Sequence, residues 1–117
     1  MELRGIHHVS INVRDTAEAV EFYTSVLGFD VRADRPDLGF AGAWLDVGDQ
    51  QVHLLEMRVP DNHGQHYAVA VADLDGAIDH VRQHGVEVSD PRTVGTGRQS
   101  FLQDPSGNTI ELHQPAE

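Results

Sequence analysis

Four residues of types that bind transition metals occupy matching places in the two halves of this 117-residue chain. His8 corresponds to His66, and His53 corresponds to Glu111 at the same offset along the sequence. Imidazole and carboxylate groups are the usual ligands of borderline divalent metals. Each residue alone is better explained as a polar residue on a solvated sheet face. The correspondence between the two pairs therefore carries the prediction of a metal site.

An internal repeat produces this correspondence. The segment His8–Asp15 matches His66–Asp73, and both alternate between apolar and other residues between a histidine and an aspartate. A period of two is typical of a half-buried strand. The segment Asp46–Leu54 matches Asp104–Leu112, and each contains residues that favour a tight turn inside a hairpin. We expect each copy to consist of a strand, a helix and three further strands.

A helix is predicted directly after the first strand of each copy. Asp15 can cap the first helix, with Glu18 placed as in a capping box, and Gly28 stands where a C-terminal glycine belongs. In the second copy Asp73 is the expected cap and Gly85 the terminating glycine. The two helices therefore have the same start and stop signals.

The repeat organises one domain of the α+β class into two βαβββ modules joined by a linker. A chain of this length fits a single domain with one substantial core. A short strand follows each helix, at about residues 29–31 and 86–88. The expected domain covers residues 1–117. Its first module is expected at about 6–57, the linker at about 58–65 and the second module at about 66–114.

Strand alternation places the ligand-type residues on the face away from each helix. Val9, Ile11 and Val13 should face the first helix, because successive strand side chains point to opposite sides. If two such curved sheets come together, the opposite faces form one concavity. The residues expected on those faces are His8, Ser10, Asn12, His53, His66, Glu111 and His113. Glu56 has the opposite parity from His53. Trp44 is expected in the core, and the alternative is that it forms part of the pocket wall.

The composition of the chain limits the classes of molecule that it is expected to bind. The formal net charge is −11, and all eight basic residues are arginine, so the surface should repel nucleic acid and anionic lipid. No cysteine is present, no apolar run approaches a membrane span, and no basic segment followed by an apolar run begins the chain. We therefore expect a cytoplasmic protein that binds a small-molecule substrate and neither nucleic acid nor membrane.

These motifs resemble the vicinal oxygen chelate superfamily, which includes glyoxalase I, bleomycin resistance proteins and extradiol dioxygenases. The resemblance covers nearly the whole chain through residues 6–15, 22–29, 66–71 and 104–112. It implies a glyoxalase-like fold, in which two βαβββ modules form a cup around a divalent metal such as Zn, Ni, Fe, Mn or Co. It also implies a homodimer.

The resemblance further implies which residues bind the metal. The first ligand falls on His8 rather than on His7, the third on His66 and the last on Glu111. The second falls on His53, where glyoxalase I and the epimerase of this superfamily have glutamate or glutamine. This departure argues against those two particular activities and leaves a site of three histidines and one carboxylate.

The leading hypothesis is a metal-dependent lyase, isomerase or thiol transferase that chelates a small substrate through vicinal oxygens. Glu111 is the expected base, and Ser10 and Asn12 are candidates to bind a substrate oxygen. Arg98 is a candidate to bind a carboxylate or phosphate, or else a surface residue. One alternative is an extradiol-type dioxygenase using ferrous iron at a two-histidine, one-carboxylate site. The other is a non-catalytic protein that sequesters a drug-like molecule.

Overall fold

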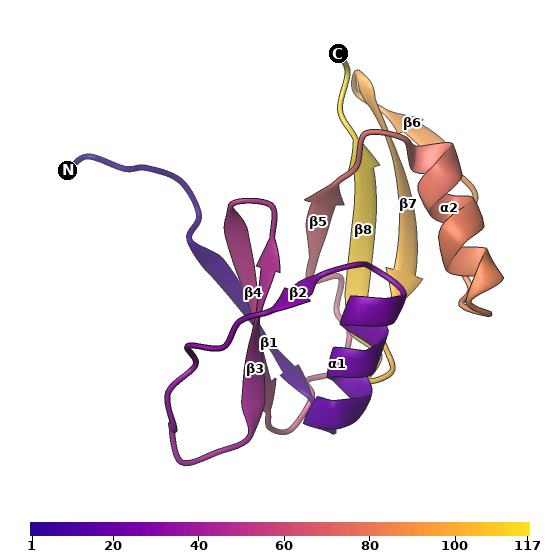
Figure 1. Cartoon of the computed structure of the whole chain (residues 1–117). Helices are drawn as coiled ribbons and strands as arrows, with labels where there is room; N and C mark the ends of the chain where they lie inside the picture. Colours follow the sequence, from indigo (N-terminus) through magenta and orange to yellow (C-terminus); the bar gives the residue numbers. More distant parts are fainter. The chain divides into compact units, whose positions relative to one another are not determined.

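The same succession of elements occurs twice in the computed structural model, which describes residues Met1 to Glu117. The first copy contains β1 (His8–Val13), α1 (Thr16–Ser25), β2 (Asp30–Val31), β3 (Gly42–Val47) and β4 (Gln50–Glu56). The second contains β5 (His66–Ala70), α2 (Leu74–Gln83), β6 (Arg92–Val94), β7 (Gly97–Gln103) and β8 (Thr109–Gln114) (Figure 1). The predicted α+β class with two βαβββ modules is confirmed. The chain divides into two units, Met1–Pro60 and Asp61–Glu117.

Each unit contains one four-stranded sheet, and the two sheets have equivalent strand orders. The orders are β1-β4-β3-β2 and β5-β8-β7-β6. In each sheet the first strand of the copy pairs in parallel with the last, and the remaining pairs are antiparallel. This topology places the start of each copy beside its end, although many residues separate them in sequence. It is the reason why His8 can lie near His53, and His66 near Glu111.

One helix packs on each sheet and buries the apolar face of its strands. Helix α1 contacts β2, β3 and β4, and α2 contacts β7 and β8. Apolar residues of strand and helix are buried together, which removes them from water and stabilises each layer. The most fully buried side chains are Val13, Tyr23, Leu45, Leu54, Leu74, Val81, Ser100 and Ile110. The predicted alternation of the strands therefore holds.

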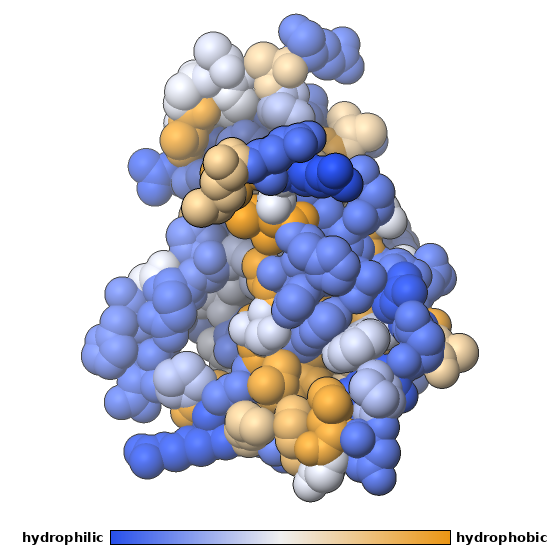
Figure 2. Space-filling model, turned by 90° about the vertical axis from the view of Figure 1, so that its left-hand side faces the viewer, coloured by the Kyte–Doolittle hydropathy of each residue, from blue (hydrophilic) through white to orange (hydrophobic).

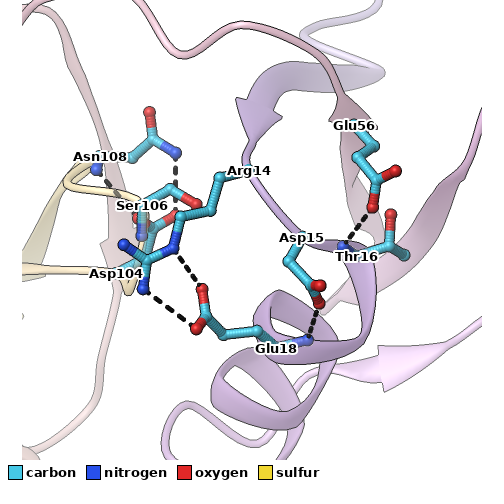
Figure 3. A network of polar contacts seen from close by, with 8 residues as sticks. All are labelled: Arg14, Asp15, Thr16, Glu18, Glu56, Asp104, Ser106 and Asn108. Atoms are coloured by element: carbon cyan, nitrogen blue, oxygen red, sulfur yellow. Dashed lines mark hydrogen bonds and ion pairs between the residues drawn. The ribbon is translucent and has the colours of Figure 1, made fainter.

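Both predicted aspartate caps are present, but the capping box is not. Asp15 Oδ1 accepts a hydrogen bond from the backbone nitrogen of Glu18 at 2.8 Å, as Figure 3 shows. Asp73 Oδ1 accepts from the nitrogen of Gly76 at 3.1 Å. The Glu18 carboxylate binds the Arg14 guanidinium instead of returning to the cap, with Nε and Oε1 2.7 Å apart. The prediction of a capping box was therefore wrong.

The short strand of the second copy lies later than expected. The strand was predicted at about residues 86–88, but β6 is formed by residues 92–94. Within the predicted segment, Val88 makes only an isolated bridge to Leu102. In the first copy β2 contains residues 30–31, inside the predicted range. The difference arises because the backbone of Ser89 also bonds to β7, at Phe101 O, before the chain turns into β6. The repeat is therefore least regular after the helices.

Hydrophilic residues dominate the face seen in Figure 2, with apolar residues in small patches between them. The most exposed large apolar side chains are those of Met1, Leu3 and Ile6, which precede β1 and belong to no helix or strand. Neither helix is long and apolar enough to cross a membrane.

Candidate metal centre

The two predicted ligands of the first unit, His8 and His53, are stacked on the sheet face opposite α1. Ser10 is the direct neighbour of His53 across the parallel pair of β1 and β4. His8 lies two residues before Ser10 on β1 and therefore on the same face. The rings of His8 and His53 lie 3.9 Å apart between centroids, at an angle of 12°. His8 is exposed, whereas His53 is only 8% exposed. The unit therefore brings its two predicted ligands into contact.

Trp44 covers the other side of the His53 ring. It is the cross-strand partner of His53 between β3 and β4, and its ring lies 4.5 Å away at an angle of 12°. Trp44 is half-buried and lies on the face away from α1, so its predicted place in the core was wrong. The strand register explains the error. Trp44 shares the face of its partner His53, whereas the next residue along β3, Leu45, points to the helix side and is buried. His53 is held between two flat rings.

Burial makes the neutral form of His53 the favoured one. Desolvation lowers the pKa of His53 from its usual value near 6.5, and positive charge on His8 and His7 lowers it further. Its Nε2 lies 2.8 Å from Gln51 Oε1, so Nε2 donates and Nδ1 keeps the lone pair. A neutral imidazole with a free lone pair is the form that binds a metal.

The lowered pKa of His53 predicts a pH-dependent stability of the metal-free protein. The unfolded chain takes up a proton near pH 6.5, while the folded chain resists it, so this contribution is present above that pH. It is lost as the pH falls through the folded-state pKa. Urea unfolding between about pH 7.5 and about pH 5 should show a smaller loss of stability for His53→Gln than for the native chain. Equal losses would contradict the prediction.

In the second unit a histidine and a carboxylate meet directly. Ala68 is the neighbour of Glu111 across β5 and β8, which places His66 on the same face. His66 Nε2 lies 3.1 Å from Glu111 Oε1. Glu111 is 8% exposed, so its carboxylate depends on polar partners rather than on bulk water. The two predicted ligands of this copy therefore face each other with the atoms that would coordinate an ion.

A backbone carbonyl fixes the orientation of the His66 ring. His66 Nδ1 lies 2.9 Å from Gly64 O, and a carbonyl only accepts, so Nδ1 carries the hydrogen. Nε2 is then the nitrogen that faces Glu111 Oε1, and in that contact it also carries a hydrogen, because a carboxylate can only accept. Ligand histidines in metal sites usually donate their other N–H in the way that Nδ1 does here. The ring is therefore oriented with Nε2 toward the site, and a bound metal would take the place of the hydrogen on Nε2.

The loop before β5 holds that carbonyl in place, and sequence reasoning did not identify it. Asn62 Oδ1 accepts from Gly64 N at 2.9 Å, and Asn62 Nδ2 donates to Thr109 Oγ1 on β8 at 2.6 Å. Gly64 has φ of 100°, a conformation that favours glycine. The Asn-His-Gly sequence was the available signal, since asparagine and glycine two residues apart are typical of a side-chain-stabilised turn.

A further histidine contacts the carboxylate from the other side. His113 Nδ1 lies 2.9 Å from Glu111 Oε2, so the two oxygens of Glu111 have different histidine partners. His113 has the strand parity of Glu111, as predicted, and it is two residues further along β8. Strand parity alone did not predict the contact between His113 and Glu111.

The remaining candidates are only partly brought to the site. Ser10 is exposed beside His53, whereas the Asn12 side chain donates to Arg58 O at 2.8 Å. Arg98 was misplaced as a substrate-binding candidate, because it lies on the opposite face of β7 from Phe101, the partner of Glu111. Its guanidinium binds both oxygens of Asp75 on α2, at 3.0 and 3.1 Å.

Glu56, the weaker candidate base, has a structural role. Its Oε1 accepts a hydrogen bond from the backbone nitrogen of Thr16 at 2.9 Å (Figure 3). That nitrogen is one of the unpaired donors at the start of α1, where a carboxylate is also favoured by the helix dipole. Glu56 therefore stabilises the helix start.

The donors fit a divalent transition metal. The structure presents them as two pairs, and within neither unit do three or more histidine or acidic side chains gather in an arrangement that holds an ion. Three imidazoles and one carboxylate suit Zn, Ni, Co, Fe or Mn better than the oxygen-preferring ions Mg and Ca. The orientation of His66 Nε2 toward Glu111 and the neutral form of His53 suit ligands that coordinate through a ring nitrogen.

Paired βαβββ modules with histidine and carboxylate residues at the equivalent ends of their strands define a recognised class of proteins. A family model described as Glyoxalase/Bleomycin resistance protein/Dioxygenase superfamily matches residues 5–112, and the chain belongs to this superfamily. The resemblance inferred from the sequence is thereby confirmed.

Similar proteins include both enzymes and a binding protein. A probable lactoylglutathione lyase from Vibrio cholerae serotype O1 is 30% identical, over 97% of this chain and 93% of the relative. The 2-epi-5-epi-valiolone epimerase of Actinomyces sp is 31% identical, over 92% of this chain and 78% of the relative. The crystal structure of TnmS3, an antibiotic binding protein from Streptomyces sp. CB03234, has a TM-score of 0.85 at 27% identity, covering 99% of both chains.

Proposed function

We propose that the protein is a metal-dependent enzyme of the glyoxalase type, acting as a lyase, isomerase or thiol transferase on a small oxygenated substrate. The observation that carries this proposal is the contact between His66 Nε2 and Glu111 Oε1, with the His66 ring oriented by Gly64 O. Two relatives of similar length, a probable lyase and an epimerase, support an enzyme rather than a structural protein.

Each unit supplies one pair of ligands in this proposal, His8 with His53 and His66 with Glu111. A bound divalent ion polarises a substrate carbonyl or hydroxyl and stabilises negative charge that develops on that oxygen. The Trp44 ring limits the movement of His53 from one side, and the ring of His8 limits it from the other.

Glu111 is the group best placed to accept a proton from the substrate. Its carboxylate is 8% exposed, so a proton taken up at Oε1 or Oε2 is shielded from exchange with bulk water. Both oxygens lie within hydrogen-bond distance of an imidazole nitrogen, which keeps the carboxylate oriented. The exposed Ser10 hydroxyl beside His53 is the candidate donor to a substrate oxygen.

Metal analysis followed by a ligand screen tests the proposal. Protein purified without chelator and reloaded with Zn, Ni, Co, Mn or Fe should bind roughly one ion per chain. The loaded protein should then be stabilised in thermal-shift assays by a thiol, dicarbonyl, catechol or acyl-CoA compound, since a ligand of the folded state raises the melting temperature. Binding of less than about a tenth of an ion after reloading would rule out a site of this kind.

A second candidate function is the binding of a planar small molecule without catalysis. The likeness to an antibiotic binding protein supports it, as does the stack of Trp44, His53 and His8, which presents aromatic surface on one sheet face. The same thermal-shift screen separates the two functions. A ligand that stabilises the metal-free and metal-loaded proteins equally would favour binding alone, whereas metal-dependent stabilisation with turnover would favour the enzyme.

A further inference from the structure

The two oxygens of Glu111 are held by different histidines of the same unit. Oε1 faces His66 Nε2 at 3.1 Å, and Oε2 faces His113 Nδ1 at 2.9 Å. We infer that His113 is a positioning residue that holds Oε2, so that Oε1 alone is presented to the metal. This inference rests on the proposed function, because it assigns His113 a role toward the same site.

The sheet places His113 where Glu111 is its natural partner. The two residues alternate along β8 on one face, and the cross-strand neighbours of His113 are Ala70 on β5 and Gln99 on β7. Neither neighbour carries a charge that competes for the ring. Because the Glu111 carboxylate can only accept, Nδ1 of His113 must carry the hydrogen in this contact.

Gly97 makes room for the His113 ring. A Cβ atom at position 97 would lie 2.8 Å from His113 Nε2 and 2.8 Å from Gln114 O, closer than such atoms approach in proteins. The φ of Gly97 is not positive, so the backbone conformation does not itself require glycine there. Glycine at position 97 therefore leaves open the space that the His113 ring occupies beside Glu111.

Holding Oε2 has a consequence for coordination. A carboxylate that binds through one oxygen occupies one position on the ion, while one that binds through both occupies two. His113 keeps Oε2 engaged, so Glu111 acts through Oε1 and leaves a further position free for a substrate oxygen. Partners of this kind typically change metal affinity by roughly 10–100-fold when they are removed.

Four variants of the full chain test the inference. His113→Leu removes the donor and should weaken Zn²⁺ binding roughly 10–100-fold in a chelator competition assay. His113→Gln keeps an N–H donor and should recover part of the affinity, whereas Gly97→Ala, which displaces the ring, should weaken binding. His80→Gln, at an exposed histidine of α2, is the matched control and should bind like the native chain.

The visible spectrum of the Co²⁺-loaded protein provides a readout that a purely structural role would not move. Release of Oε2 in His113→Leu should raise the coordination number and weaken the absorption bands, and His113→Gln should restore them. Without added metal, nitrogen-15 NMR should show a hydrogen on His113 Nδ1.

The outcomes separate the inference from the proposed function. A native chain that binds metal while His113→Leu keeps its affinity and Co²⁺ spectrum would overturn the inference alone. A His113 ring without a hydrogen on Nδ1 would do the same, because the hydrogen bond to Glu111 would then be absent. A native chain that binds no divalent metal would overturn both.

Discussion

Replacing His66 with alanine is expected to weaken divalent-metal binding by roughly a hundredfold or more. Four-ligand zinc sites bind with about 10–16 kcal/mol, so one ligand accounts for about 3 kcal/mol or more, and each 1.4 kcal/mol corresponds to about a tenfold change in affinity. The His66 ring is oriented by Gly64 O toward Glu111, and alanine supplies no donor atom at this position. Competition with a chelator of known affinity measures the loss directly.

His63→Ala is the matched control for this experiment. His63 is exposed in the same loop, where its backbone nitrogen donates a hydrogen bond to Gln65 Oε1 at 2.8 Å. Its side chain should therefore be dispensable, and the variant should bind metal like the native chain. Equal metal affinity in His66→Ala and His63→Ala would show that His66 is not a ligand.

The repeat allowed much of the fold to be predicted from the sequence. Strand periodicity gave the correct faces for His53 and Glu111, since a one-residue error would have moved each to the helix side. The caps Asp15 and Asp73 are local signals that act within a few residues, and both were confirmed. These features depend on patterns that lie within one element or are repeated in the second copy.

What could not be predicted depends on contacts between elements. The place of Trp44 against His53 follows from the register of β3 against β4, which periodicity does not specify. Arg98 was misplaced for the same reason, because the parity of β7 is set by its pairing with β8. The contact of His66 with Gly64 O is made by a loop backbone, whose conformation no strand or helix pattern describes.

Replacing Asp104 with alanine is expected to lower the free energy of unfolding by about 3 kcal/mol, because several hydrogen bonds to one charged group are lost together. Asp104 is 5% exposed, and its Oδ1 accepts from the backbone nitrogens of Ser106 and Asn108, each at 2.9 Å (Figure 3). Its Oδ2 accepts from Asn108 Nδ2 at 2.9 Å. This turn leads into β8, so its loss should also displace Glu111. Urea unfolding gives the change.

Two comparison variants separate the loss of the hydrogen bonds from the loss of a turn residue. Asp104→Asn keeps an oxygen for the two backbone donors but sets an amide against Asn108, so it should lose only about 1 kcal/mol. Asp49→Ala changes an exposed aspartate in the corresponding turn of the first unit and should lie within about 0.5 kcal/mol of the native chain. If Asp104→Ala were no less stable than Asp49→Ala, the buried carboxylate would not be what holds the turn. In that case the pairing of β8 with β5 and β7 would be sufficient to position Glu111.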